Sequence, residues 1–164
     1  MAVTEAELEI LAAELGAAFL RHGWQLATAE SCTGGWLAQV VTSVAGSSAW
    51  FDRGFVTYSN AAKQDSLGVS PETLDQFGAV SEATAREMAR GTLGHSAAQV
   101  AIAITGIAGP GGGSVEKPVG TVCFAWIVAD QACVSVTQKF DGNRCQVRAA
   151  SVAFALRQLQ ALVP

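Results

Sequence analysis

The stretch QVAIAITG, residues 99–106, constrains the fold more than any other segment. It is almost continuously apolar and rich in β-branched residues. Strands that are covered on both faces have this pattern, whereas half-exposed strands alternate apolar with polar residues. Residues 99–106 are therefore predicted to form a central strand of an α/β sheet.

The other elements are predicted from hydrophobic spacing, helix caps and turns. Thr4 and Glu7 form a capping-box pattern before apolar residues at helical spacing, which predicts a first helix ending near Arg21. Residues 24–30 (WQLATAE) have the pattern of a second buried strand. The remaining predictions are helices at 34–44, 60–67, from 70–72 onward, 81–93 and 143–162, strands at 53–59, 119–129 and 132–140, and turns at 46–48 and 130–131.

Strands that alternate with helices indicate an α/β fold, and the late pair of consecutive strands indicates a mixed sheet. Half of the 164 residues are hydrophobic and only 15% are charged, which suits a compact fold with a sizeable core. No repeat, low-complexity tract or linker interrupts the chain. We therefore expect a single domain over residues 1–164.

Composition argues against several classes of function. The net charge is −4 and the lysines and arginines do not cluster, so a nucleic-acid-binding surface is not expected. No apolar run approaches the ~18 residues that a membrane span requires. The acidic, amphipathic start does not resemble a secretory signal, and the 4 cysteines form no CxxC pair that would suggest zinc. The expectation is a cytoplasmic protein with reduced thiols and neither metal nor membrane contact.

A polar segment, TAESCTGG at residues 28–35, follows the predicted strand at 24–30 and precedes a helix. Ligands of α/β folds bind beyond the carboxyl ends of strands, where unpaired helix N–H groups favour an anion or a developing oxyanion. Ser31, Cys32 and Thr33 offer two hydroxyls and a thiol there, and Gly34 allows close approach to a ligand. The alternative is that Ser31 or Thr33 only caps the helix.

A serine nucleophile needs a base. His22 and His95 are predicted at helix ends away from the strand tips, so Lys63 is the better candidate, with Tyr58 five residues before it. Acting as a base would require the lysine pKa to fall by about 3 units, which burial and a helix N-terminus favour. The alternative is that Lys63 is a surface cation. Cys32 is the rival nucleophile, without a histidine nearby in sequence.

Two further features point to a ligand. The loop TGIAGPGGG follows the central strand but lacks the Walker pattern, so it is either a ligand loop, with Thr105 as its best polar contact, or a flexible connection. Arg144 and Arg148 lie four apart, on one face at the start of the last helix. They either grip a carboxylate or phosphate, or pair with Asp141 or Asp65.

Four segments together resemble the CinA carboxy-terminal domain family, over about residues 5–160. They are residues 28–63 (TAESCTGG through SNAAK), 78–89 (GAVSEATAREMA), 105–122 (TGIAGPGGGSVEKPVGTV) and 140–148 (FDGNRCQVR). The resemblance implies a single-domain three-layer α/β/α sandwich with a mixed, mostly parallel sheet, commonly assembled as a homodimer. The amino-terminal domain of longer family proteins has no counterpart in this chain.

The resemblance also implies an activity: hydrolysis of the carboxamide of nicotinamide mononucleotide (NMN) to nicotinate mononucleotide and ammonia, in pyridine nucleotide salvage, without a cofactor. Ser31 would be the nucleophile, Lys63 its base and Tyr58 a positioning or proton-relay group. N–H groups after Ser31 would hold the oxyanion. The residues implied for substrate binding are Thr33, Gly34, Gly46, Ser48, Thr105, Gly106 and Arg144.

Two positions depart from the family pattern. Asn143 stands where relatives often have aspartate, which could change how Arg144 is held. Thr105 stands where some relatives have serine, and it keeps the hydroxyl. Two other functions stay open: a nucleotide-binding regulatory module without turnover, and an amidase for another small carboxamide. Ammonia formation from a panel of amides would separate all three.

Overall fold

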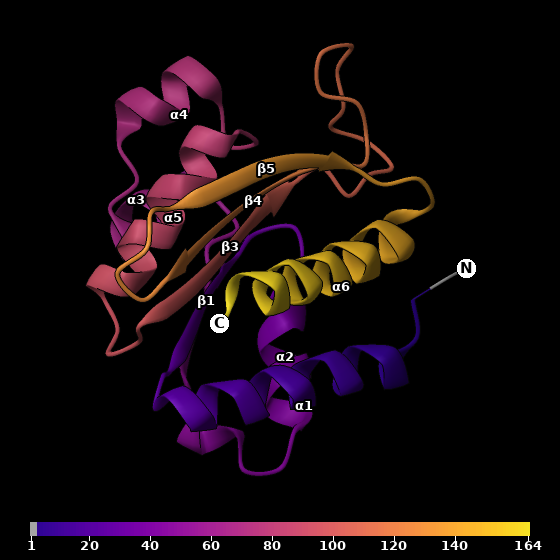
Figure 1. Ribbon diagram of the computed structural model, residues 1–164. Coiled ribbons are helices and arrows are strands. Elements are labelled where there is room, and N and C mark those ends of the chain that lie inside the picture. Colours follow the sequence, from indigo (N-terminus) through magenta and orange to yellow (C-terminus); the bar gives the residue numbers. More distant parts are fainter. Residues whose placement is uncertain (1–2) are drawn as a thin grey trace.

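The computed structural model describes residues 3–164 as one five-stranded sheet with helices on both faces (Figure 1). The strands are β1 (Leu26–Glu30), β2 (Phe51–Val56), β3 (Val100–Gly106), β4 (Thr121–Val128) and β5 (Val134–Lys139). The α-helices are α1 (Glu5–His22), α2 (Trp36–Ser43), α3 (Asn60–Leu67), α4 (Pro71–Phe77), α5 (Glu82–Gly94) and α6 (Arg144–Leu162), and a 3-10 turn, η1, covers Ser47–Ala49.

The sheet has the strand order β2-β1-β3-β4-β5 and is mixed, mostly parallel. Strand β1 pairs in parallel with β2 and with β3, whereas β4 is antiparallel to both β3 and β5. Because β5 is antiparallel to β4, it runs with the other three, and only β4 is reversed. The predicted central strand is thus confirmed: β3 lies in the middle of the sheet and is buried from Val100 to Thr105.

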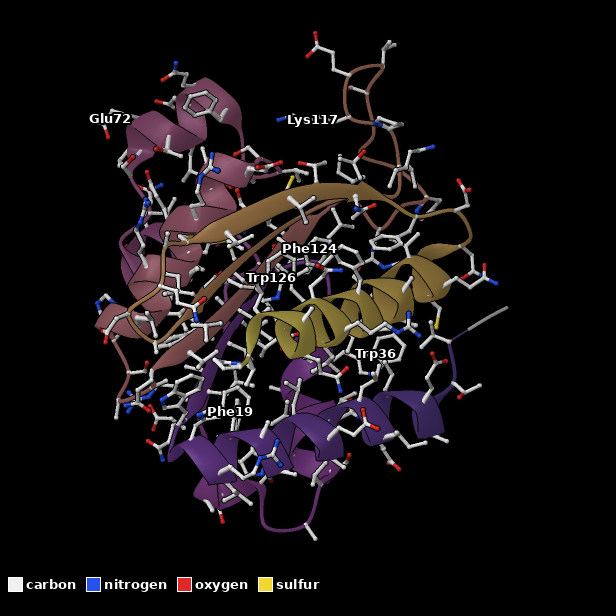
Figure 2. The ribbon with its side chains drawn as sticks, viewed as in Figure 1. Phe19, Trp36, Glu72, Lys117, Phe124 and Trp126 are labelled. Atoms are coloured by element: carbon white, nitrogen blue, oxygen red, sulfur yellow. The ribbon has the colours of Figure 1, made fainter. Side chains whose placement is uncertain are left out.

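Helices cover the sheet in two layers, which confirms the α/β/α sandwich. On one face, α1, α2 and α6 pack over a core that includes Phe19, Trp50 and Trp126 (Figures 1 and 2). On the other face, α3, α4 and α5 close a smaller core around Met88 and Leu67. Each layer hides one face of β3, which explains why its sequence is apolar throughout.

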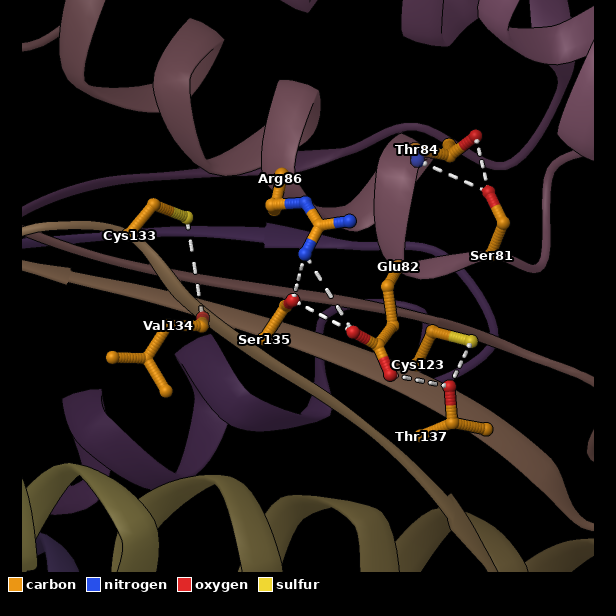
Figure 3. A network of polar contacts seen from close by, with 9 residues as sticks. All are labelled: Ser81, Glu82, Thr84, Arg86, Cys123, Cys133, Val134, Ser135 and Thr137. Carbon is orange, nitrogen blue, oxygen red and sulfur yellow. Dashed lines mark hydrogen bonds and ion pairs between the residues drawn. The ribbon is translucent and has the colours of Figure 1, made fainter.

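Polar contacts fix α5 to the edge strand β5 (Figure 3). The Glu82 carboxylate accepts hydrogen bonds from the hydroxyls of Ser135 (2.8 Å) and Thr137 (3.1 Å), and Arg86 donates to Ser135. Thr137 also lies 3.4 Å from the Cys123 sulfur, whose pKa is raised by burial. This network ties the second helical layer to the sheet.

Three sequence-based details need correction. Strand β2 begins at Phe51 and ends at Val56 rather than spanning 53–59, so Tyr58 lies in the loop beyond it. The Thr4 hydroxyl caps α1 through the Glu7 N–H, but the Glu7 carboxylate pairs with Arg157 on α6, so the reciprocal half of the capping box is replaced by a tertiary contact. Helix α2 begins at Trp36, after a turn at 31–35.

The other helices begin and end close to the predicted positions. Asn143 caps α6 in a complete capping box with Gln146, and Ser59 caps α3 by accepting from the Ala62 N–H. Among residues 3–164 no helix combines the length and the hydropathy needed to cross a bilayer. The carboxyl ends of β1, β2 and β3 share one edge of the sheet, and the predicted site residues gather at that edge.

Candidate active site

Ser31 and Lys63 meet beyond the carboxyl end of β1. Ser31 is the first residue after that strand, and its backbone N–H donates to the Ile104 carbonyl of β3 (2.9 Å). Lys63 lies in the first turns of α3, after the loop that follows β2. Lys63 Nζ and Ser31 Oγ are 3.0 Å apart. The structure therefore brings together a hydroxyl and an amine that are 32 positions apart in the sequence.

Lys63 is not a surface cation. Its side chain is 1% exposed, and Nζ donates to the Thr57 carbonyl at 2.8 Å. Burial lowers the pKa of the Lys63 ammonium from its ordinary value, and the neighbouring Cys32 thiol opposes this shift. No carboxylate forms an ion pair with Lys63 within the described residues. A buried amine with a lowered pKa and a serine hydroxyl at contact distance is the arrangement that general-base activation requires.

Glu30 holds the turn on which Ser31 sits. This last residue of β1 is fully buried, and its carboxylate accepts from the N–H groups of Leu37 (2.8 Å) and Ala38 (3.1 Å) in the first turn of α2. The residue that precedes α2, Gly35, provides no side-chain cap. Glu30 thus replaces a local N-cap and joins the end of the strand to the start of the helix.

The turn leaves two backbone donors free next to Ser31. The Gly34 N–H donates to the Ser31 carbonyl (3.0 Å), but in the part of the chain described, the N–H groups of Cys32 and Thr33 have no backbone or side-chain acceptor on another residue. Free N–H groups after a nucleophile are the usual material of an oxyanion hole. Burial raises the pKa of the Cys32 thiol to about 11, with a further contribution from Glu30, so this thiol stays protonated and is a poor nucleophile near neutral pH.

A cavity of about 280 Å³ opens beside Ser31 and Lys63. It is walled by the tip of β3, the glycine-rich loop after it and residues before α5. Lys117 braces that loop by donating to the Phe77 carbonyl at the end of α4 (Figure 2). The lining residues are Ser31, Cys32, Tyr58, Lys63, Ala79, Val80, Thr105–Ala108, Gly109, Gly111, Gly112 and Arg144. Two of them, Lys63 and Arg144, are basic and none is an acid, and the Arg144 guanidinium suits an anionic ligand.

Tyr58 and Arg144 form the rim of this cavity. Arg144 donates to the Tyr58 hydroxyl (2.8 Å) and to the Gly109 carbonyl (2.8 Å). The Tyr58 side chain is 62% exposed, so its ring and hydroxyl are available to a ligand. The arginine joins the start of α6, the loop after β2 and the glycine-rich loop, three segments far apart in the sequence.

Thr105 and Gly106 end β3 inside the cavity wall. The Thr105 hydroxyl donates to the Ala79 carbonyl (2.8 Å), which leaves its lone pairs as acceptors. A Cβ at Gly106 would lie 2.8 Å from a Val122 methyl group and 2.9 Å from its Cα. Glycine is therefore required for β3 to pair closely with β4 at this point.

Four other residues predicted for substrate binding do not line this cavity. Thr33 is buried with an unpaired hydroxyl among the described residues, and Gly34 lines a different cavity with Arg148. Gly46 and Ser48 are exposed beyond the end of α2. Helix α2 leads away from the turn at 31–35, and the Trp50 carbonyl accepts from the Leu26 N–H at the start of β1. Gly46 and Ser48 therefore lie near the amino end of β1, whereas Ser31 follows its carboxyl end.

The structure also places the histidines and the two arginines of the last helix. His22 stacks on Trp24 and His95 contacts the Gly91 carbonyl, both away from the cavity as expected. In residues 3–164, neither Arg144 nor Arg148 forms an ion pair with Asp141 or Asp65. Sequence reasoning missed Glu30 as the cap of α2; its position just before SCTGG, with no capping side chain at Gly34 or Gly35, was the available signal.

The family model of the CinA C-terminal domain matches residues 8–163. The chain belongs to the CinA C-terminal domain family. It is similar to the nicotinamide-nucleotide amidohydrolases PncC of Enterobacter agglomerans (53% identical, covering 94% of each chain) and of Escherichia coli K12 (52% identical, covering 96% of this chain and 95% of that protein).

A solved structure has the same fold. The crystal structure of the competence/damage inducible protein CihA from Agrobacterium tumefaciens superimposes with a TM-score of 0.93, at 49% identity over 99% of each chain. Asn143, at the position where the family resemblance led us to expect an aspartate, caps α6, and asparagine caps helices as well as aspartate does. Arg144 is accordingly held at the first position of a regular helix.

Proposed function

We propose that the chain hydrolyses the carboxamide of NMN, giving nicotinate mononucleotide and ammonia, in pyridine nucleotide salvage. The observation that carries the proposal is the 3.0 Å contact between Ser31 Oγ and the buried Lys63 Nζ, in a cavity that Arg144 also lines and that has no acidic lining residue. Two relatives above 50% identity over nearly the whole chain bear the name nicotinamide-nucleotide amidohydrolase, which supports this choice of substrate.

The first half of the reaction forms an ester on Ser31. Neutral Lys63 accepts the Ser31 hydroxyl proton while Oγ attacks the carboxamide carbon. The N–H groups of Cys32 and Thr33 stabilise the negative oxygen of the tetrahedral intermediate. As the intermediate collapses, the C–N bond breaks, Lys63 returns the proton to the leaving nitrogen, and ammonia departs.

The second half regenerates the enzyme. A water molecule gives its proton to Lys63 and attacks the ester carbon, and a second tetrahedral intermediate forms at the same N–H groups. The ester C–O bond then breaks, Ser31 recovers a proton from Lys63, and nicotinate mononucleotide is released. The Thr57 carbonyl holds one N–H of the Lys63 amine, and rotation about that contact can bring the nitrogen lone pair to Ser31.

The cations and glycines of the cavity fit the rest of the nucleotide. Arg144 is placed at the rim, where it can bind the phosphate, and Tyr58 can exchange its contact with Arg144 for one with the substrate. Thr105 offers acceptor lone pairs to the ribose or the amide, and Gly106 leaves room beside it. No step requires a metal or an organic cofactor.

The second candidate is a nucleotide-binding module without turnover. Purified protein is incubated with NMN, nicotinamide and glutamine, and ammonia is measured alongside the thermal stabilisation that each compound gives. The proposal predicts ammonia from NMN alone. Stabilisation by NMN without ammonia would favour the binding module, and ammonia from glutamine or nicotinamide would indicate a different amidase.

A further inference from the structure

Arg148 takes no part in the reaction described above, yet it is bound to the turn that carries Ser31. From the second turn of α6, its Nε donates to the Cys32 carbonyl (3.1 Å) and its Nη2 to the Thr33 carbonyl (2.8 Å). It does not line the cavity beside Ser31, unlike Arg144 one helical turn earlier. The two arginines on this face of α6 therefore have different tasks.

We propose that Arg148 is a positioning residue that orients the oxyanion-binding N–H of Thr33. The inference rests on the proposed amidohydrolase function and extends it to a residue outside the cavity. In a trans peptide the C=O and the N–H point in opposite directions. An arginine that holds the Cys32 carbonyl on one side of the turn thereby fixes the Thr33 N–H on the other side.

The neighbouring peptides complete the arrangement. Arg148 also holds the Thr33 carbonyl, and the N–H of that peptide, on Gly34, closes the turn onto the Ser31 carbonyl. Since the Ser31 carbonyl accepts from Gly34, the N–H of its own peptide, on Cys32, is directed the other way. Among the described residues, the N–H groups of this turn without an acceptor on another residue are those of Cys32, Thr33 and Gly35, and the first two directly follow the nucleophile.

Contact with Trp36 holds the Arg148 side chain in place, and its positive charge strengthens the Thr33 N–H as a hydrogen-bond donor. Its guanidinium lies 5.2 Å from the centre of the Trp36 ring, a cation–π distance that restrains the side chain. A cation hydrogen-bonded to a carbonyl polarises that peptide and strengthens the donor at its other end. The positive charge of Arg148 favours an anion near residue 32, since it partly offsets the rise in the Cys32 pKa that burial and the Glu30 carboxylate cause.

The test compares Arg148→Ala and Arg148→Lys with wild type in steady-state ammonia release from NMN. Arg157→Ala is the matched control, because Arg157 is on the same helix but pairs with Glu7 on α1. Misplacement of an oxyanion donor predicts a fall in kcat of roughly 10²-fold with KM and product binding unchanged. Lysine keeps the charge but not the two-carbonyl fork, so Arg148→Lys should remain well below wild type.

Chemical rescue separates positioning from general stability. Guanidinium added at sub-denaturing concentration should raise kcat in Arg148→Ala and not in wild type or Arg157→Ala, while urea should rescue none. Equal kcat in wild type and both Arg148 variants would overturn this inference and leave the amidohydrolase function intact. Loss of activity that follows the melting temperature and resists guanidinium would also overturn it. Wild type that releases no ammonia would overturn the function and the inference together.

Discussion

Replacing Lys63 with methionine isolates the contribution of the buried amine. Methionine keeps a flexible side chain of similar length but can neither accept the Ser31 proton nor donate to the Thr57 carbonyl. General-base catalysis typically contributes 10²–10⁴-fold, so kcat/KM for NMN should fall by about that factor, or about 3–5 kcal/mol in barrier height.

Stability should change far less than activity. The Thr57 carbonyl loses its donor, at a cost of about 1–3 kcal/mol, but removing a buried amine with a lowered pKa offsets part of that loss. Ammonia release, nucleotide binding and chemical denaturation are measured in the same preparation. Binding is expected to survive, because Arg144 and the glycine-rich loop are untouched.

The matched control is Lys139→Met, since the Lys139 side chain is 54% exposed at the end of β5, where its Nζ lies 3.9 Å from the Asp141 carboxylate and away from the cavity. It should retain wild-type kcat/KM. The reasoning is refuted if Lys63→Met keeps substantial ammonia release, or if its activity falls only in proportion to its folded fraction.

Three further predictions concern the same region. Because the Lys63 pKa is lowered in the folded state, the unfolded chain binds more protons between that lowered pKa and the ordinary lysine value of 10.5. The free energy of unfolding should therefore rise with pH across this range, and its slope against pH should be smaller in Lys63→Met. Iodoacetamide near pH 8 should alkylate exposed Cys145 before Cys32, whose pKa is about 11, as read by peptide mass spectrometry; early modification of Cys32 would contradict its burial. Arg144→Met should raise KM for NMN about 10- to 100-fold with a smaller effect on kcat, the loss expected for a charge-assisted hydrogen bond, and an unchanged KM would remove Arg144 from the phosphate site.

The fold could be predicted because its strongest signals are local. The apolar runs that became β1 and β3 are buried on both faces, and Thr4, Ser59, Ser70, Ser81 and Asn143 each cap the helix that follows them. The start of β2 was less clear, because Phe51 and Asp52 precede the segment whose pattern looked strand-like. Strand ends depend on partners across the sheet, which a local pattern does not contain.

The candidate site was predictable only in part. Ser31 and Lys63 each follow one of two parallel strands, whose carboxyl ends lie at the same edge of the sheet. The contact between Ser31 and Lys63 could therefore be expected. The contact of Arg148 with Cys32 joins residues 116 positions apart, and nothing in either segment announces it. Likewise, the Glu7 carboxylate does not complete the expected capping box but accepts a hydrogen bond from Arg157, 150 positions away.

The proposed mechanism depends on Ser31 as the nucleophile of an NMN amidohydrolase. The most direct measurement is ammonia release from NMN by wild type and by Ser31→Ala, with binding of nicotinate mononucleotide measured in both. The account predicts stoichiometric ammonia and nicotinate mononucleotide from wild type, and neither from a Ser31→Ala protein that still binds the product. Undiminished ammonia release by Ser31→Ala would contradict it.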